Sequence, residues 1–421
     1  MKNIGKIKNL NIEFTAPPSK AHTLRALAIA GLAEGQTIIN NPLLADDQQN
    51  MIGCLRRLGI GVEIKNGQIF VNGGSGKFSP LGSELNVGES GVTMNFLTAA
   101  ACLCDKPVIL TGSARIQERP VDELVSGLRQ LGCKIDYLKN EGCVPVKIHG
   151  GGINGGTAKM HGQRTSQYFS ALVISAALAK SDCVIECVDE MTERPYFDIS
   201  VDMMAKFGGK AENKNYKKII VPGRQKYLGR EITIEGDHSS ASFFFLAAAI
   251  CKAQINIKGL QKDSKQGDKA FVDLLAKMGC KVEYSENSIL LAGGELKSIE
   301  QDMSNIPDLV PPIAVAAGFA KGKSKFTNIG HLRHKECDRL AVVAEELNKM
   351  GIKAFCDDDS LTVIGNSAGA KGAVIDPHND HRIAMSFAAA GLVVGNQRID
   401  NEKCVGKSFP DFWEKFEIFY K

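Results

Sequence analysis

Residues 236–252 read GDHSSASFFFLAAAICK, and this pattern of a polar cluster followed by an apolar run decides how the rest of the chain is interpreted. The polar cluster Asp237 to Ser240 opens directly onto the apolar run Ala241 to Lys252. The run is too apolar for a surface helix, so it predicts a buried helix whose N-terminal amides lie beside capping residues. The N-terminus of such a helix can bind an anion.

Five other stretches have the same design. In each, a short polar or charged cluster precedes a helix-length run of Ala and other small or aliphatic residues. Brought together with nearby Lys and Arg residues, such helix starts suit a substrate that carries several phosphate and carboxylate groups. The five predicted helices span Leu24 to Ala33, Val92 to Cys104, Tyr168 to Ala179, Leu309 to Ala320 and Ile383 to Val394.

A second regular feature is a glycine that ends an amphipathic helix and precedes an alternating, strand-like stretch such as Cys133 to Tyr137 or Lys281 to Tyr284. Successive glycines of this kind are separated by 73, 76, 71 and 72 residues. A period near 70 residues is too long for the common solenoid repeats and fits βαβ-type units. No sixth glycine follows near Trp413. The five positions are Gly59, Gly132, Gly208, Gly279 and Gly351.

Length and composition favour a two-domain globular protein. The 421 residues exceed what one core usually supports, and 44% hydrophobic with 23% charged residues is ordinary. The net charge of +4 argues against nucleic acid or an anionic membrane as a partner. The first residues lack the apolar core of a signal peptide, and the longest apolar run, 243–251, is too short to span a bilayer, so we expect a cytoplasmic protein.

The twelve cysteines and the paired histidines give no metal-site pattern. There is no Cys-x-x-Cys, and cysteines such as Cys102 and Cys104 lie in apolar runs, which favours reduced core thiols. The pairs at 331 and 334 and at 378 and 381 lack a matching third ligand motif, so we expect no metal.

The glycine-rich stretch HGGGINGG at residues 149–156 matches a dinucleotide fingerprint by letter alone. The residues that follow do not open a helix, so we predict a turn between strands. Neither a Walker sequence nor a Gly-x-Ser-x-Gly elbow occurs, which argues against nucleotide hydrolysis and serine hydrolase chemistry.

Basic residues near the predicted helix starts are the candidate site residues. Taken singly, each is more often a solvated charge. Several, however, lie beside an acid or His able to fix their position, as in Glu118-Arg119-Pro120. The set comprises Lys20, Arg25, Arg119, Lys335, Arg339, Arg382 and Lys407.

At these residues the sequence resembles the enolpyruvyl transferases, in particular the branch whose acceptor is shikimate 3-phosphate. The resemblance covers almost the whole chain, from Pro18-Ser19-Lys20 to the GKSFPD at 406–411. The other motifs that carry it are GDHSSAS at 236–242, NIPD at 305–308, KECDRL at 335–340 and NDHR at 379–382.

The resemblance implies a mixed α/β (α+β) fold of two domains. Each would contain three βαβαββ-type repeats with buried helices directed at an active-site cleft between the domains. One domain would comprise residues 19–235 and the other residues 1–18 with 236–421. The resemblance also implies a monomer that needs no metal or organic cofactor and that contacts small-molecule substrates, with neither nucleic acid nor membrane as a partner.

The resemblance implies phosphoenolpyruvate as the donor. Arg side chains suit its carboxylate and phosphate because they offer bidentate hydrogen bonds. Gly91 is retained in the loop that resembles the family's cleft-lining loop, which leaves room for glyphosate at the donor position. The implied donor residues are Lys20, Gly91, Arg119, Gln167, Arg339, Arg382 and Lys407.

The resemblance also assigns the acceptor and the proton transfers. Shikimate 3-phosphate would place its phosphate near Thr165, Ser166, Tyr196 and Lys335, with Gln167 beside it, its carboxylate near Arg25 and its ring hydroxyls near Asp308. Asp308 or Lys335 would take the proton of the 5-hydroxyl, and Glu336 or Lys20 would protonate the methylene carbon of phosphoenolpyruvate. Addition gives a tetrahedral intermediate, and loss of phosphate and a proton restores the vinyl group.

The sequence departs from the family pattern mainly on the acceptor side. Ala21 stands where the family has Ser after the first Lys, and Glu193 stands where Ser is usual before Arg194-Pro195-Tyr196. An acid near a bound phosphate is unfavourable unless Arg194 neutralises it or the side chain turns away.

Three alternatives remain at this point. A transferase acting on a different cyclic alcohol would explain Ala21 and Glu193. An anion-binding paralogue without turnover is disfavoured because Lys20, Asp308 and Glu336 are all present. The relative that acts on UDP-N-acetylglucosamine is also disfavoured, because the loop GSARIQ at 112–117 lacks its Cys. The RNA 3'-phosphate cyclases, which share a related repeat architecture, are a more remote comparison.

Overall fold

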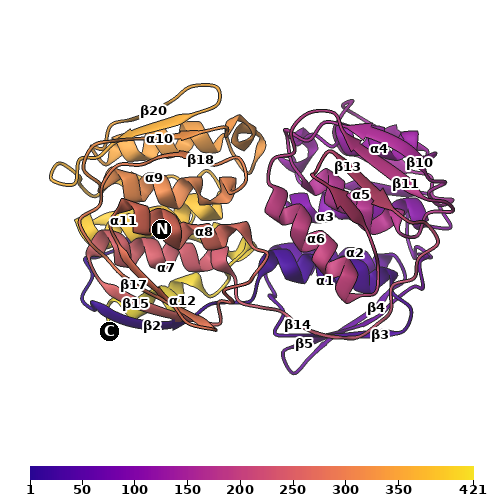
Figure 1. The fold of residues 1–421 in the computed structure, drawn as a ribbon, viewed down its shortest axis with the longest axis horizontal. Coiled ribbons are helices and arrows are strands. Elements are labelled where there is room, and N and C mark those ends of the chain that lie inside the picture. The colour runs from indigo at the N-terminus through magenta and orange to yellow at the C-terminus, as the bar shows by residue number, and fades with distance from the viewer. The chain divides into compact units, whose positions relative to one another are not determined.

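The computed structural model describes residues 1–421 and divides them into two compact units (Figure 1). The inserted unit comprises Lys20–Ile234, and the terminal unit comprises Met1–Ser19 together with Glu235–Lys421. Each unit has its own hydrophobic core. None of the helices has the length and apolar character that crossing a bilayer requires.

The inserted unit contains three four-stranded sheets, each with two helices. The first sheet has the order β14 (Glu231–Thr233), β3 (Gln36–Asn40), β5 (Gln68–Asn72), β4 (Gly61–Lys65), with helices α1 (Lys20–Leu32) and α2 (Asp46–Arg57). The second has the order β6 (Glu84–Asn86), β7 (Val108–Thr111), β9 (Val146–Ile148), β8 (Ile135–Tyr137), with α3 (Gly91–Ala100) and α4 (Asp122–Gln130). The third has the order β10 (Gly156–Met160), β11 (Cys183–Cys187), β13 (Lys218–Val221), β12 (Glu212–Lys214), with α5 (Gln167–Ala176) and α6 (Arg194–Lys206).

The terminal unit repeats this plan twice and shortens the third copy. The first sheet has the order β16 (Lys281–Tyr284), β17 (Ser288–Ala292), β15 (Gln254–Lys258), β2 (Asn11–Thr15), with α7 (His238–Cys251) and α8 (Ala270–Met278). The second has the order β18 (Glu300–Asp302), β19 (Lys323–Thr327), β21 (Leu361–Ile364), β20 (Ala354–Cys356), with α9 (Val310–Gly318) and α10 (Arg339–Lys349). The third has three strands in the order β1 (Lys2–Ile4), β23 (Gln397–Ile399), β22 (Val374–Ile375), with α11 (His381–Val394) and α12 (Phe412–Phe416).

Strand pairing confirms the βαβαββ repeat. In the second sheet of the inserted unit, β6 pairs parallel with β7 across α3, and β9 pairs antiparallel with both β7 and β8. The first sheet of each unit is completed by a strand from a distant part of the chain. In the inserted unit β14 pairs parallel with β3, and in the terminal unit β2 pairs parallel with β15. These two strands lie next to the two points where the chain passes between units.

All six Ala-rich stretches form buried helices, as the sequence predicts. In α7 every residue from His238 to Ile250 is buried, and in the terminal unit α7, α9 and α11 pack against one another (Figure 1). In the inserted unit α3 packs against α1 and α5. Polar side chains cap several of these helices: Ser90 Oγ accepts from Thr93 N at 3.3 Å, and Asp237 Oδ1 accepts from Ser239 N at 2.9 Å.

The five periodic glycines adopt the left-handed conformation that the sequence predicts, with φ values from +80° to +118°. A Cβ atom at Gly59 would lie 2.6 Å from the carbonyl oxygen of Ser79, so only glycine fits. The stretch at residues 149–156 joins β9 to β10 as predicted, with Gly150, Gly151, Gly152 and Gly155 at positive φ.

The shortened last repeat accounts for the missing sixth glycine. Where the other repeats add a fourth strand, this one ends in an aromatic cluster around Phe244 of α7. Phe14 stacks on Phe244 with ring centroids 4.0 Å apart, and the rings of Phe409, Phe412, Phe416 and Phe419 lie within 6.5 Å of it. Buried aromatic surface here replaces a strand as the means of closing the core.

Candidate active site

Arg339 is the centre of a buried charge cluster in the terminal unit. Its side chain is 1% exposed and contacts three carboxylates. Nη1 lies 2.9 Å from Asp308 Oδ1, Nη2 lies 2.8 Å from Glu336 Oε2, and Nε lies 2.8 Å from Asp380 Oδ2. The planar guanidinium thus fixes three acids around one point.

Two further cations extend this cluster. Arg382 Nη2 lies 2.7 Å from Asp308 Oδ2, and its Nη1 donates to Ser239 Oγ at 2.5 Å. Lys407 Nζ lies 2.9 Å from Glu336 Oε1. Three cations and three carboxylates therefore share one region with little solvent contact, and we refer to these six residues as the charge cluster.

Burial and pairing have opposite effects on the charges of the cluster. Burial disfavours ionisation of Asp308, but Arg382, Arg339 and the nearby Lys335 together hold the pKa of its carboxyl well below its usual range. Burial likewise disfavours the charged form of Arg339, whereas Asp380, Glu336 and Asp308 raise the pKa of Arg339 well above its usual value. Both residues are therefore ionised at neutral pH.

Helix ends position the cluster. Asp338 caps α10, accepting from Ala341 N at 3.1 Å, and Arg339 is the first residue of that helix. Asp380 caps α11 with Oδ1, which accepts from Arg382 N at 2.8 Å, and its Oδ2 faces Arg339. The Asp380 carboxylate thus caps the N-terminus of α11 and holds the Arg339 guanidinium at the same time.

In the inserted unit, Lys20 begins α1 and pairs with Asp47 of α2. The distance from Lys20 Nζ to Asp47 Oδ2 is 2.5 Å, and the Asp47 side chain is 3% exposed. The sequence reasoning did not single out Asp47, although Asp46-Asp47 at the start of an amphipathic helix was a visible signal.

Gly91 and Arg119 lie against each other. A Cβ atom built on Gly91 would be 2.6 Å from the guanidinium carbon of Arg119, so the glycine leaves the space that this guanidinium occupies. Gln167, at the start of α5, accepts a hydrogen bond from Asn95 Nδ2 at 3.3 Å. Three of the predicted donor residues are thus held by α3, α5 and the segment before α4.

Two of the predicted acceptor-phosphate residues, Thr165 and Ser166, donate to Glu193. The Thr165 hydroxyl donates to Glu193 Oε2, and the Ser166 hydroxyl donates to the Glu193 carbonyl oxygen at 2.7 Å. Glu193 is fully buried and has φ of +54°, just before the start of α6. Arg194, considered above as its neutralising partner, pairs with Glu190 at 2.7 Å.

Arg25 donates hydrogen bonds to three groups of its own unit. It is 1% exposed, and it donates to Ser200 Oγ at 2.7 Å, to the Ala21 carbonyl at 3.0 Å and to the Tyr196 carbonyl at 2.8 Å. Burial lowers the pKa of Arg25 to about 10, although Tyr196 and Glu193 act in the opposite direction. Arg25 therefore ties α1 to α6 and brings positive charge close to Glu193.

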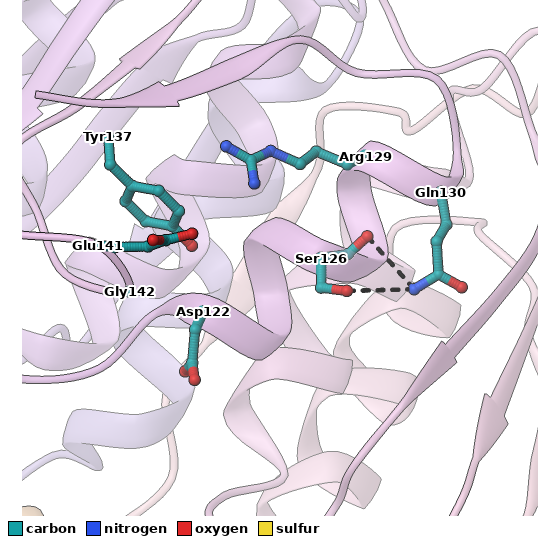
Figure 2. A pocket seen from close by; sticks show the side chains of 7 residues that line it. All are labelled: Asp122, Ser126, Arg129, Gln130, Tyr137, Glu141 and Gly142. Carbon is teal, nitrogen blue, oxygen red and sulfur yellow. Dashed lines mark hydrogen bonds between the residues drawn. The ribbon is translucent and has the colours of Figure 1, made fainter.

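One pocket of the inserted unit contains none of the predicted site residues. It lies against α4 and β8 and is lined by Asp122, Ser126, Arg129, Gln130, Tyr137, Glu141 and Gly142 (Figure 2). Arg129 lies over the Tyr137 ring at 5.0 Å and donates twice to the Ile135 carbonyl. Arg56 makes the same pair of bonds to the Val62 carbonyl in the preceding repeat, so this arginine is part of the repeat architecture.

All twelve cysteines are free thiols. Elsewhere, ligand atoms of Glu345, Glu346 and His378 lie within 4.8 Å of one another. The Lys349 ammonium pairs with both carboxylates, at 3.0 and 2.7 Å, and offsets one of their two negative charges.

Comparison with known proteins identifies the family. The model of the family described as EPSP synthase (3-phosphoshikimate 1-carboxyvinyltransferase) matches residues 4–416. The chain is 39% identical over 407 residues to the 3-phosphoshikimate 1-carboxyvinyltransferase of Methanoregula boonei, with 96% of each chain covered. It is 40% identical over 403 residues to the protein of that name from Methanoculleus marisnigri, with 95% of each covered.

Comparison with solved structures points to the same family. The EPSP synthase of Acinetobacter baumannii matches the fold with a TM-score of 0.81 at 27% sequence identity, covering 98% of this chain and 96% of that chain. The resemblance inferred from the sequence motifs and the two-domain α/β fold are both confirmed. The chain belongs to the EPSP synthase family, the 3-phosphoshikimate 1-carboxyvinyltransferases.

Proposed function

We propose that this enolpyruvyl transferase of the shikimate pathway binds and activates its substrates with the charged residues predicted from its sequence. The reaction moves the enolpyruvyl group of phosphoenolpyruvate to the 5-hydroxyl of shikimate 3-phosphate and releases phosphate. The observation that carries the proposal is the charge cluster, in which Asp308 and Glu336 are each held by two cations.

The donor anions are assigned to the cations of the cluster. Arg339, Arg382 and Lys407 would bind phosphoenolpyruvate together with Lys20, Arg119 and Gln167 of the inserted unit. Guanidinium groups that are already desolvated and fixed lose little entropy when an anion replaces a carboxylate partner. Because Gly91 has no side chain, the Arg119 guanidinium can occupy the space beside it.

Asp308 is proposed as the base for the 5-hydroxyl, with Lys335 as its neighbour. While Arg339 and Arg382 contact Asp308, its low pKa makes it a weak base. Substrate anions that draw these guanidinium groups away would raise the pKa of Asp308. Binding of the donor would in this way activate the base that takes the proton of the acceptor hydroxyl.

Lys20 is proposed as the acid that protonates the methylene carbon. Its amino group is held by Asp47, with Nζ 2.5 Å from Oδ2. Glu336 is flanked by Arg339 and Lys407, a setting that favours the carboxylate form, so it suits removal of the methyl proton in the second step. Addition forms the C–O bond to C2, and elimination breaks the C–O bond to phosphate and restores the vinyl group.

The acceptor phosphate is assigned to Thr165, Ser166, Gln167 and Tyr196, with Lys335. Hydroxyls at the start of α5 suit a phosphate because the exposed amides and the positive dipole end of the helix lie there. Arg25 would act on the acceptor mainly through its charge, since three of its five N–H donors already bind the protein. We further propose a monomer, and the twelve free thiols support a reducing, cytoplasmic setting.

The test is phosphate release from phosphoenolpyruvate with and without shikimate 3-phosphate, followed by mass analysis of the product. Release that depends on the acceptor and yields the enolpyruvyl ether supports the proposal. Protection against heat by phosphoenolpyruvate without any release would contradict the acceptor assignment and direct attention to Ala21 and Glu193.

A further inference from the structure

Asp268 is a buried carboxylate next to the charge cluster that has no role in the mechanism above. It lies in the short 3-10 helix η3 (Gly267–Lys269) and is 4% exposed. Its side chain is hydrogen-bonded to Ser239, whose Oγ also accepts from Arg382 Nη1 at 2.5 Å. Arg382 in turn contacts Asp308 at 2.7 Å. A continuous chain of contacts therefore leads from Asp268 to the proposed catalytic base.

The direction of these hydrogen bonds follows from the chemistry of the groups. A guanidinium can only donate, so the Ser239 hydroxyl must accept from Arg382. The single hydroxyl proton of Ser239 is then left to point at Asp268. Whether ionised or protonated, Asp268 has a carboxyl oxygen that can accept this hydrogen bond, so it orients Ser239 and fixes one edge of the Arg382 guanidinium.

The segment that carries Asp268 is anchored to the start of α7. Gln266 Oε1 accepts from His238 N at 2.9 Å, and Gln266 Nε2 donates to Glu235 Oε1 at 2.6 Å and to the Gly236 carbonyl at 2.8 Å. The two partners of the Ser239 side chain are Asp268, on the anchored segment, and Arg382, in α11. A change in the position of the Asp268 side chain therefore moves the Ser239 hydroxyl and, with it, the Arg382 guanidinium.

We propose that Asp268 is a positioning residue for phosphoenolpyruvate, which orients Arg382 through Ser239 and takes up a proton when the anionic substrate binds. This inference rests on the proposed function, because it assigns Arg382 to the donor.

The electrostatic surroundings support proton uptake. Burial and the neighbouring carboxylate of Asp308 raise the pKa of Asp268 to about 7, against the effects of Arg382 and Ser239, and Asp237 adds to the increase. Bound phosphoenolpyruvate adds negative charge beside Arg382 and shares its positive charge, so it raises this pKa further.

The sign of the pH effect follows from this shift. A group whose pKa rises on binding takes up a proton, so affinity is highest below the free-state pKa and falls as the pH rises above about 7. The neighbouring His238 and Lys269 do not add a pH dependence of their own between pH 6.5 and 8.5. Burial lowers the pKa of His238 to about 4, so its ring is neutral in this window, and the Lys269 ammonium donates to the Ser264 carbonyl at 2.8 Å.

The experiment measures KM for phosphoenolpyruvate between pH 6.5 and 8.5, with saturating shikimate 3-phosphate, for four proteins. These are the wild type, Asp268→Asn, Asp268→Ala and the control Asp273→Asn, which changes an exposed acid of α8. For the wild type we expect KM to rise about fivefold from pH 7 to 8, as the linkage relation gives for partial uptake of one proton. The substrate phosphate titrates near pH 6 in every protein, so its effect cancels in the comparison.

In Asp268→Asn we expect the rise above pH 7 to disappear, while Asp273→Asn behaves as the wild type. In Asp268→Ala the Ser239 contact is lost, and we expect KM to increase about tenfold at pH 7 with kcat within about twofold, as for loss of one hydrogen bond to a charged group. A wild-type pH profile in Asp268→Asn would overturn the inference, as would an unchanged KM in a folded Asp268→Ala. If Asp268→Ala does not fold, the Asp268→Asn profile decides.

Failure of the proposed function is recognised separately. If the wild type releases no phosphate with shikimate 3-phosphate, the reaction assignment fails. Calorimetric titration with phosphoenolpyruvate in two buffers of different ionisation enthalpy then counts the protons taken up on binding. Proton uptake at pH 7.5 by the wild type but not by Asp268→Asn supports the inference, and equal uptake in both proteins refutes it.

Discussion

The ammonium nitrogen of Lys20 lies 2.5 Å from Oδ2 of Asp47, at the junction of the first turns of α1 and α2. The Asp47 side chain is 3% exposed, so the pair is shielded from bulk water. A shielded, paired ammonium has a defined direction for each of its protons, which is what an acid acting on a substrate carbon needs.

Replacing Lys20 by Met should therefore lower kcat by about 10²- to 10⁴-fold, the usual effect of removing a general acid. Steady-state phosphate release checks this, with Lys226→Met as the control, since Lys226 is exposed and pairs only with the exposed Glu34. A Lys20→Met enzyme with wild-type kcat would remove Lys20 from proton transfer. Because the variant leaves Asp47 buried without this partner, Lys20→Met/Asp47→Asn serves to separate lost stability from lost chemistry.

Glu336→Gln should lower kcat by at least about 10²-fold with a smaller change in KM for either substrate. The neutral amide keeps the shape of the side chain but is a far weaker base, and it leaves Arg339 and Lys407 each with one ionic partner fewer. The measurement is single-turnover formation of product, with the exposed Glu286→Gln as the control. An unchanged rate would show that Glu336 takes no part in moving protons.

Gly91→Ala should raise KM for phosphoenolpyruvate by about tenfold, which corresponds to ~1.4 kcal/mol. The new methyl group would lie 2.6 Å from the Arg119 guanidinium carbon and must displace it. Because glyphosate is expected at the same place, its inhibition should weaken in parallel.

The matched control for Gly91→Ala is Gly53→Ala in α2, where nothing lies within 4 Å of the added Cβ. That change should leave kinetics unaltered and stabilise the helix by up to about 1 kcal/mol. Equal KM values in Gly91→Ala and the wild type would contradict the proposed role of Arg119.

Glu193→Gln should lower KM for shikimate 3-phosphate several-fold and leave KM for phosphoenolpyruvate unchanged. The buried carboxylate accepts from the Thr165 hydroxyl, which is proposed to bind the phosphate. Removing the charge of Glu193 therefore reduces repulsion of the phosphate while keeping an oxygen to accept from Thr165. Initial rates at varied acceptor test this, with the exposed Glu190→Gln as the control. A higher KM for the acceptor in Glu193→Gln would show that the carboxylate helps rather than hinders binding.

Much of the fold could be predicted because it depends on local chemistry. A run such as Phe243 to Ala249 has no polar face, so it must be buried whatever it packs against, and the helix type follows from its length. The periodic glycines were equally visible, since positive φ at a helix end selects glycine with little regard to context. The motifs that carried the family resemblance include the residues of the charge cluster, which is why most of that cluster was named in advance.

The partners of those residues could not be predicted in the same way. Asp268 carries no distinctive local pattern, and the visible signals at Asp47 and Ser239 do not say which side chains these residues contact. Those contacts appear only when strands and helices far apart in the sequence meet. Arg382 and Ser239, for example, are 143 positions apart.

The sequence by itself therefore determined the six buried helices and the five glycine helix ends, and it supplied the charged residues proposed for the site, because each depends on side-chain type and on neighbours along the chain. Only the tertiary structure decided that β2 and β14 complete sheets begun elsewhere, that Arg25 donates hydrogen bonds within its own unit, and that the pKa of Asp308 is lowered while that of Asp268 is raised to about 7. Strand pairing, burial and charge–charge distances are properties of the folded chain, and they set these outcomes.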